Sequence, residues 1–587
     1  MTEHFLPTQT KAAEKTAALQ NLSELVERHL GFRAQRFRTG LRIRTLTNPR
    51  KTIVLRVDLS SKILRARIVC LRFSVPGLLL FACAARGGYV LQLGKNATTA
   101  TAGVDSFFTP SDAGLGVSTN HVVEIINGRF SVFNKSLTRL QTLTDSNFWF
   151  RAGITVPSGW GFSDPRILFD TPSQRWFASS VDVNDANDAN RFLLAISGTA
   201  DPTGTWHGVA FTADPVNGYW ADFPTLGIDA NAVYLSGDMF DRFGDAIGPA
   251  LACIPKTDLL LTTPSVAGRT SFGVLDYSRY GEILQPVVTV GAASSPEAVL
   301  AVGDLGFDYL THSTLVGTVV QNGASEGGAT LSSPTTISIP GYSIPINPLQ
   351  LGGITNNIDD GDARISAMVY RVGDVIYATH GTQINGRAAI QWFKIGAPSM
   401  NLIATGTITD PALDLFYPSI AANGGGTVAL AFNASSATSA VSSYAVLGEP
   451  VNGTLSFGNL ALLKAGVAAY RTNEDDSRWG DYSAITVDPA NPTHFWALTM
   501  YPSSKSAWST QITELIAAPL VLAMSASRTN VTLSWPAAAG GYQLQFTPKL
   551  SSPNWMPVTT QTLTPTNNQY VVSLSVTNGA QFFRLAK

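Results

Sequence analysis

The chain has 587 residues, of which 45% are hydrophobic and 14% are charged. This length and apolar content indicate a folded protein with a large core, and exclude a disordered chain or a small disulfide-stapled one. The formal net charge is −1, but residues 1–86 hold 16 Lys and Arg against 5 Asp and Glu, which leaves 24 basic and 36 acidic residues in 87–587. Such an acidic body argues against a nucleic-acid partner, which requires a basic face.

Residues 1–86 are predicted to form a basic N-terminal extension. An amphipathic helix is expected over 9–30, followed by irregular Arg-rich sequence to Arg72. Segment 65–86 combines a basic flank, an apolar run of about ten residues and small residues, a pattern typical of a secretory signal. The run is too short to span a bilayer, so no transmembrane span is expected.

The position of this signal-like segment, far from Met1, leaves alternatives open. One is that the chain begins upstream of its natural start. Another is a genuine intracellular extension whose apolar run is a buried strand. A third is lipidation of Cys83, since Leu80–Cys83 resembles a bacterial lipidation box in which Phe81 fits poorly.

One phrase recurs along the middle of the chain. It begins with an acidic or aromatic residue, continues through Pro or a small residue into a short apolar strand, and is followed by a turn and a second strand. Five clear copies begin at Asp164, Asp222, Asp362, Phe416 and Asp481, and weaker copies occupy 115–120 and 298–304. A hairpin unit that repeats in this way is typical of a β-propeller.

We therefore predict an all-β protein with a roughly seven-bladed propeller over 87–515; six or eight blades are the alternatives. Four Trp residues are expected in the core between blades: Trp176, Trp206, Trp392 and Trp496. Cys253 lies in the apolar strand 251–254 and is expected to be a buried core thiol rather than a nucleophile.

Residues 516–587 differ from the body, because apolar residues alternate in strands about ten residues apart, as in a small β-sandwich. The run Val531–Pro536, followed by Tyr542–Gln545, resembles a fibronectin type III-like domain. That resemblance covers about 70 residues.

Three phrases of the body, at 200–206, 222–227 and 478–483, resemble a group of large secreted bacterial propellers related to the sialidase-like superfamily. The resemblance covers about 400 residues and implies a propeller, but it carries little information on function, since that group is mostly uncharacterised. Thr199–Trp206 is a near copy of the Asp box of sialidases, with Gly one place late; in that family the box is a structural turn.

A ligand site is expected at the mouth of the central channel, where the repeated phrases begin. Arg side chains there would pair bidentately with a substrate carboxylate, acids would act in acid–base catalysis, and a Tyr with a carboxylate partner would act as nucleophile. The candidate residues are Asp164, Arg166, Asp222, Asp362, Arg364, Tyr417, Arg478, Asp481 and Tyr482.

The alternative is that these residues are structural, with each Asp capping a turn and each Arg pairing with an acid of its own or the next blade. Convergence of Arg166, Arg364 and Arg478 beside a Tyr–acid pair would favour a glycoside hydrolase or lyase acting on acidic sugars. Pairing of each Arg with nearby carboxylates would favour a scaffold.

Two acidic loops offer hard oxygen ligands suited to structural Ca²⁺. The candidate ligands are Asp182, Asp185 and Asp188 in the first loop and Asp359 and Asp360 in the second. A solvated loop is the alternative in both cases, since the Gly and terminal Glu of a helix-loop-helix calcium site are missing.

We interpret the chain as an extracellular or cell-surface binding or scaffold protein that recognises a glycan or a protein at the channel mouth. A glycosidase-type enzyme is the alternative, and an intracellular protein with a basic arm is a third possibility.

Overall fold

The computed structural model describes four strands before residue 88, at 43–48, 52–57, 68–72 and 79–83, and then most of residues 88–586. The gaps after residue 88 are 292–295, 304–311, 354–357, 360–362, 472–477, 528, 540, 550–553, 559–564, 567–568 and 576–580. The chain forms two compact units, one of Tyr89–Ala518 and one of Met1–Gly88 with Pro519–Lys587.

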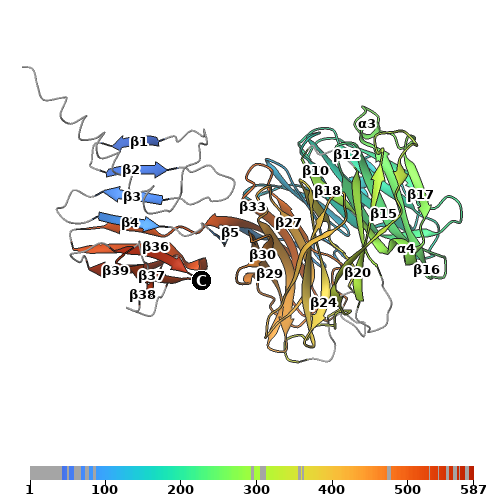
Figure 1. The fold of residues 1–587 in the computed structure, drawn as a ribbon. Helices are drawn as coiled ribbons and strands as arrows, with labels where there is room; N and C mark the ends of the chain where they lie inside the picture. Colours follow the sequence, from blue (N-terminus) through green and yellow to red (C-terminus); the bar gives the residue numbers. More distant parts are fainter. Residues whose placement is uncertain are drawn as a thin grey trace, which may run out of the picture. The chain divides into compact units, whose positions relative to one another are not determined.

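The unit Tyr89–Ala518 is a β-propeller of seven blades, each an antiparallel sheet. In blades one to six the first strand in sequence is the innermost, and in blade seven the innermost strand is β32 (Ala484–Val487). Figure 1 shows the strands of this unit. The first three blades contain these strands: β6 (Gly114–Val117), β7 (His121–Ile126), β8 (Arg129–Asn134) and β9 (Arg139–Thr144); β10 (Gly161–Asp170), β11 (Arg175–Val183), β12 (Arg191–Ser197) and β13 (Trp206–Thr212); β14 (Trp220–Ile228), β15 (Ala232–Phe240), β16 (Ala246–Pro255) and β17 (Thr270–Val274).

Blades four to seven follow in the same order around the ring. Their strands are β18 (Glu282–Val290), β19 (Glu297–Val302), β20 (His312–Gln321), β21 (Thr330–Leu331) and β22 (Thr335–Tyr342); β23 (Val369–Val372), β24 (Val375–Ile384), β25 (Arg387–Gly396) and β26 (Leu402–Ile408); β27 (Asp414–Ala422), β28 (Val428–Ser436), β29 (Ser439–Val451), β30 (Thr454–Phe457) and β31 (Ala461–Lys464); β32 (Ala484–Val487), β33 (His494–Pro502), β34 (Trp508–Pro519) and β5 (Tyr89–Thr101).

The described helices are short: α2 (Asp145–Arg151), α3 (Lys256–Leu259), α4 (Tyr277–Tyr280) and the 3₁₀ turn η1 (Ala537–Ala539). Within the described part of the chain, none has the length and apolar character needed to cross a membrane.

The ring is closed by pairing the first strand of the propeller with its last blade. β5 is the outermost strand of blade seven and is hydrogen-bonded to β34, so the two ends of the unit share one sheet. This arrangement satisfies backbone groups that an open ring would leave at an exposed sheet edge.

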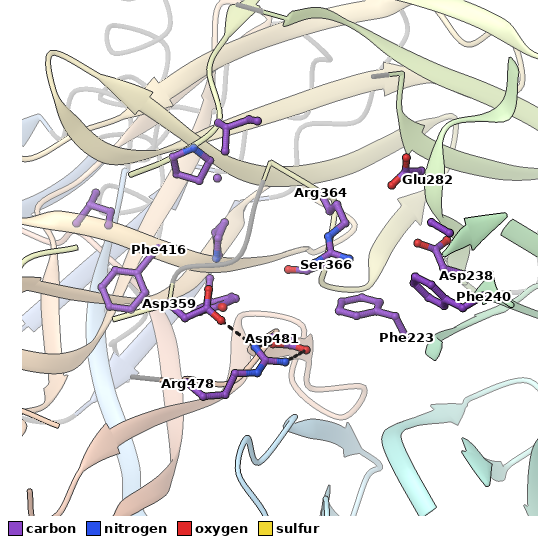
Figure 2. Close-up of a pocket in the computed structure, with 17 residues that line it drawn as sticks. Phe223, Asp238, Phe240, Glu282, Asp359, Arg364, Ser366, Phe416, Arg478 and Asp481 are labelled. Atoms are coloured by element: carbon purple, nitrogen blue, oxygen red, sulfur yellow. Dashed lines mark hydrogen bonds and ion pairs between the residues drawn. The ribbon is translucent and has the colours of Figure 1, made fainter. Parts of the chain in front are cut away.

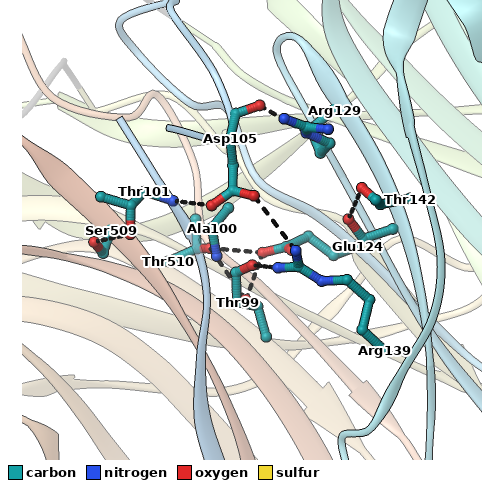
Figure 3. A network of polar contacts seen from close by, with 11 residues as sticks. Thr99, Ala100, Thr101, Asp105, Glu124, Arg129, Arg139, Thr142, Ser509 and Thr510 are labelled. Carbon is teal, nitrogen blue, oxygen red and sulfur yellow. Dashed lines mark hydrogen bonds and ion pairs between the residues drawn. The ribbon is translucent and has the colours of Figure 1, made fainter. Parts of the chain in front are cut away.

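A buried polar network joins this closing strand to blade one (Figure 3). Glu124 of β7 is fully buried, and its Oε1 accepts hydrogen bonds from the hydroxyls of Thr99 at 2.8 Å and Thr510 at 2.6 Å. Arg139 of β9 donates to the carbonyl of Thr99 and lies 3.4 Å from Asp105. Burial raises the pKa of Glu124, and the two Thr hydroxyls offset part of that effect.

In five of the seven inner strands, a described residue within the first four positions or just before the strand has left-handed backbone conformation. These residues are Asp112 (φ 42°), Asp164 (57°), Phe223 (49°), Ile283 (49°) and Tyr417 (48°). The strand register shifts at this point in blades two, three, four and six, as in a β-bulge. The bulge lets consecutive side chains of the inner strand point toward the channel mouth instead of alternating between faces.

The repeated phrases at 164, 222 and 416 form inner strands, and those at 362 and 481 directly precede inner strands. The weak phrase at 298–304 was assigned wrongly, since it belongs to β19, the second strand of blade four. The inner strand there is β18, which begins Glu282-Ile283 and carries its Pro two residues later than in blades two and three, counted from the left-handed residue.

The predicted core residues are buried. Trp176, Trp206, Trp392 and Trp496 are at most 6% exposed and belong to hydrophobic clusters, and Cys253 is 1% exposed. Burial raises the pKa of the Cys253 thiol to about 12, as expected of a core thiol.

The Asp-box copy forms the turn between β12 and β13. Asp201 accepts a backbone hydrogen bond from Thr203 at 2.9 Å, and the Trp206 indole donates to the carbonyl of Pro202 at 2.9 Å. The role of this motif here is structural.

The second unit contains two sheets. Its C-terminal strands are β35 (Ala523–Ala526), β36 (Asn530–Pro536) and β39 (Gln569–Ser575) in one sheet, and β37 (Gln543–Thr547), β38 (Met556–Pro557) and β40 (Phe582–Ala586) in the other. Trp535 is fully buried. The fibronectin type III-like assignment remains a prediction.

The N-terminal segment contains strands where irregular sequence was expected. They are β1 (Ile43–Asn48), β2 (Thr52–Val57), β3 (Ile68–Arg72) and β4 (Leu79–Cys83). β4 pairs in parallel with β40, at Phe81 with Phe582 and Ala82 with Phe583, because its apolar run has strand propensity. The predicted helix 9–30 lies outside the described residues, and the secretory signal remains a prediction.

We predict that Glu124→Ala lowers the free energy of unfolding of the propeller by about 2–4 kcal/mol, because two buried Thr hydroxyls lose their acceptor. Glu124→Gln is expected to lower the free energy of unfolding by less. Its side-chain oxygen can still accept from the two Thr hydroxyls, and the buried site favours an uncharged group. Urea unfolding measures both. Glu326→Ala, at an exposed site, is the control; equal losses in Glu124→Ala and the control would contradict the prediction.

Candidate functional site

A cavity of about 390 Å³ lies at one end of the central channel. Residues of blades three to seven line it (Figure 2). Its size falls within the range of roughly 300–1,000 Å³ typical of small-molecule sites.

The floor of the cavity is apolar and tightly buried. Phe223, Leu415, Phe416 and Tyr417 contribute to it, and each is at most 5% exposed. The walls combine polar and apolar side chains. The polar ones include Glu282, Asp359, Arg364, Ser366, Arg478 and Asp481, and the apolar ones include Phe240, Ile344 and Pro345. A ligand would thus meet hydrogen-bonding groups on the sides and hydrocarbon below.

Arg478 is held by two carboxylates on one wall of the cavity. Its Nη1 lies 3.1 Å from Asp359 Oδ2, and its Nη2 donates to Asp481 Oδ2 at 2.8 Å, while a second, shorter contact joins Nη1 to Asp481 Oδ1. Both ends of the guanidinium fork are therefore occupied (Figure 2).

Two further acids lie behind this wall in the channel. Asp112 and Asp164 are 1% and 5% exposed, and the charge of Asp164 acts on the Asp112 carboxyl group. Asn127 connects the pair: its Nδ2 donates to Asp112 at 2.8 Å, and its Oδ1 accepts from the backbone N–H of Asp164 at 2.9 Å. Asp112 also accepts from the Asp481 N–H at 2.9 Å.

Burial and mutual repulsion raise the pKa values of these acids. The pKa of Asp164 rises to about 6, first by burial and then by the charge of Asp222. Burial, followed by Asp481 and Asp164, raises the pKa of Asp112 well above its usual range. The pKa values of Asp222 and Asp481 are also raised, mainly by burial.

Arg166 closes the channel below these acids. It is 2% exposed and donates to the carbonyls of Pro224 at 3.0 Å and Ser366 at 3.1 Å, and its guanidinium lies 3.3 Å from the ring centre of Tyr482. The Tyr482 hydroxyl donates to the carbonyl of Pro165 at 3.3 Å. These contacts join blades two, three, five and seven, so the cavity is closed at its inner end.

The other end of the channel differs in chemistry. A smaller cavity of about 90 Å³ lies there, lined by apolar residues such as Leu168, Ile228, Val288 and Tyr370. Among the described residues, Asp170 is the charged one that lines this smaller cavity, whereas six charged residues line the larger one.

The structure brings most of the predicted site residues to this mouth but gives them different roles. Arg364, Tyr417, Arg478 and Asp481 line the cavity. The others of the set that are described, namely Asp164, Arg166, Asp222 and Tyr482, lie beneath or behind the wall. Asp362 lies outside the described residues.

The candidate Ca²⁺ ligands do not meet in one place. Asp182 is fully buried and paired with Arg191, its Oδ2 lying 2.6 Å from Nη2. Asp188 accepts a hydrogen bond from Asn184 at 2.8 Å, Asp185 is exposed, and Asp359 is bound to Arg478. Asp360 lies outside the described residues, among which no group of three or more acids, His or Cys is placed to hold a metal. The Ca²⁺ site remains a prediction.

Sequence reasoning missed several residues of the site. Asp112 lies three residues before Leu115, the start of the weak phrase, just as Asp164 lies three residues before Ile167. Aligning the two inner strands on Leu115 and Ile167 would therefore have identified Asp112 as a site residue. Glu282 was missed because blade four was assigned from β19. Asp238 and Phe240, at the end of the second strand of blade three, carried no repeat signal.

No protein-family model matches the sequence, and no curated protein matches it. Solved structures do match, at low similarity. An α-L-arabinofuranosidase, Arb93A from Fusarium graminearum, is 8% identical, with a TM-score of 0.33 over 72% of this chain and 97% of that chain. The Dos1 propeller is 9% identical, with a TM-score of 0.35 over 82% and 93%.

An exo-β-1,3-galactanase from Clostridium thermocellum is 10% identical, with a TM-score of 0.28 over 72% of this chain and 100% of that chain. Similarity at this level identifies no residue of the site. The strand order by itself defines the protein as a seven-bladed β-propeller. The blind cavity described above lies at one mouth of this propeller.

We predict that the protein loses stability as pH rises from about 4 to 6. The folded pKa of Asp164, about 6, exceeds the ordinary value of 3.8, so the folded state binds more protons in this window. Asp164 alone then contributes about 3 kcal/mol at low pH that is lost above pH 6. Asp164→Asn, which tolerates the positive φ, is expected to flatten this dependence in urea unfolding.

Asp185→Asn, at an exposed position, serves as the control and is expected to keep the wild-type dependence of unfolding free energy on pH. The prediction fails if Asp164→Asn and wild type show the same change in unfolding midpoint between the two pH values.

Proposed function

We propose that the protein binds a glycan at this channel mouth. The observation that carries the proposal is the blind cavity of about 390 Å³ with polar groups on its walls and an apolar floor. Carboxylates and guanidinium groups accept from and donate to sugar hydroxyls, while the hydrocarbon face of a sugar ring packs on an aromatic side chain.

Phe240 is the aromatic side chain best placed for that packing. It ends β15, lines the cavity and is half-buried, and it stacks on Trp220 with ring centres 5.1 Å apart at 30°. Trp220 therefore holds the Phe240 ring in one orientation, and a fixed ring loses little entropy on binding.

We place the protein outside the cell or on the cell surface, as the signal-like segment 65–86 and the resemblance to secreted sialidase-like propellers suggest. A protein partner at the same mouth remains the alternative occupant.

The test is a glycan array with the full chain, followed by titration calorimetry on each glycan that binds. Phe240→Ala is expected to weaken binding about tenfold, or about 1.4 kcal/mol. The matched control is Phe243→Ala, three residues further along the chain, whose ring is 74% exposed and outside the cavity. Binding of no glycan, or equal losses in both variants, would refute the proposal.

A second candidate is a glycosidase, favoured by Asp481. This acid lies on the cavity wall, and a glycosidase requires carboxyl groups beside its substrate. The bidentate pairing of Arg478 and the burial of Arg166 leave neither in the open arrangement expected of a carboxylate clamp.

If the protein is a glycosidase, Asp481→Asn lowers the rate at which reducing sugar is released from the bound glycans by at least about a hundredfold. Asp374→Asn, at a side chain 91% exposed on another turn, retains wild-type rates. Bound glycans that are never cleaved by the wild type would leave the protein as a binding module.

A further inference from the structure

The cavity wall carries more negative than positive charge. The acidic residues that line it are Asp238, Glu282, Asp359 and Asp481, and the basic residues that line it are Arg364 and Arg478. With every group ionised, the described lining has a net charge of −2. A concave site with one prevailing sign of charge concentrates ions of the opposite sign.

The excess of negative charge is not spread evenly over the cavity wall. Arg478 is bound to Asp359 and Asp481 on one wall. Glu282, Asp238 and Phe240 lie together on the opposite side, with Arg364 between the two groups (Figure 2). The two carboxylates on that side, from blades three and four, therefore share one lining arginine.

These two carboxylates are set firmly in the fold. Asp238 is 6% exposed, and its Oδ1 accepts from the backbone N–H of Ile283 at 3.0 Å, which ties the second strand of blade three to the inner strand of blade four. Glu282 precedes Ile283 in the chain and is half-buried. Fixed carboxylates bind a cation without first losing side-chain freedom.

Acids behind the wall also act on these carboxylates. Asp222 interacts with both Asp238 and Asp481, and Asp164 interacts with Asp222, while Arg364 acts on Asp222 and Arg166 on Asp164. The propeller segments that the structure does not describe contain no Lys or Arg in their sequence, so they supply no basic side chain to offset these acids.

We infer that the ligand of this site carries a protonated amine, which lies against Glu282 and Asp238 beside the ring of Phe240. The preferred sugar is therefore an amino sugar with a free amine rather than its acetylated or acidic counterpart. The inference rests on the proposed function and names the class of glycan.

The chemistry of the three groups fits a primary ammonium. An –NH₃⁺ group has three donors, and two carboxylates supply acceptors with charge assistance. An aromatic face adds a further attraction for a cation. A sugar carboxylate at the same position would face like charges, which disfavours acidic sugars.

The experiment measures the affinity of the full-length protein for three tetrasaccharides by calorimetry, at about pH 5.5, where sugar amines are protonated. The probes are a glucosamine tetramer, an N-acetylglucosamine tetramer and a galacturonate tetramer. We expect the glucosamine tetramer to bind about tenfold more tightly than the acetylated one, and the acidic one to bind most weakly. The preference is expected to shrink as salt is raised, because salt screens the charges.

Glu282→Gln keeps the shape of the side chain and removes its charge, and it is expected to reduce the tenfold preference for the amine to about threefold or less. Asp374→Asn, an exposed carboxylate outside the cavity, keeps the full preference. The salt titration tests the wild type, so the result does not depend on the variant folding.

Three outcomes overturn the inference. Equal or tighter binding of the acetylated or acidic tetramer refutes it while leaving the proposed glycan site intact. A preference for the amine that neither salt nor Glu282→Gln changes also refutes it, because the selectivity would then lie elsewhere. Binding of no glycan in the array or the calorimeter refutes the proposed function, and the inference with it.

Discussion

Closure of the ring through β5 is the constraint on which the rest of the propeller depends. This strand brings residues near 100 next to residues near 510, so its pairing fixes the position of every blade between them. Such a distant contact is costly in chain entropy, and the network around Glu124 stabilises it with buried, nearly complete hydrogen bonding. Blades one and seven are thereby neighbours, and the seven blades surround one central axis.

Closing the ring also forces like charges together. The inner strands of blades one, two, three and seven each bring one acid to the same mouth, at Asp112, Asp164, Asp222 and Asp481. Burial and repulsion make this arrangement unfavourable and raise the pKa values of the acids, while Arg166 beside Asp164 and Arg478 beside Asp481 offset part of that effect. Unfavourable electrostatics of this kind are typical of functional sites, because a ligand of opposite charge relieves them.

The same repeat position serves two purposes. In blade two, Arg166 points down the channel, joins four blades and makes a solid base. In blade five, Arg364 occupies the same position of the repeated phrase and faces the open cavity. The rigid base is what allows the walls to carry polar groups, since charged side chains hold a fixed geometry only when the backbone beneath them is fixed.

The sequence by itself determined the all-β class, the repeat and the core, because hairpin patterning, turn residues and apolar strands are local signals. It also placed Arg364, Arg478 and Asp481 near a channel mouth. Tertiary structure alone decided that Arg166 and Tyr482 close the channel, and that Asp238 and Phe240 join the cavity. It also decided that β18, not β19, is the inner strand of blade four. These outcomes depend on bulges at left-handed residues and on contacts between distant blades, which leave no periodic trace in the sequence.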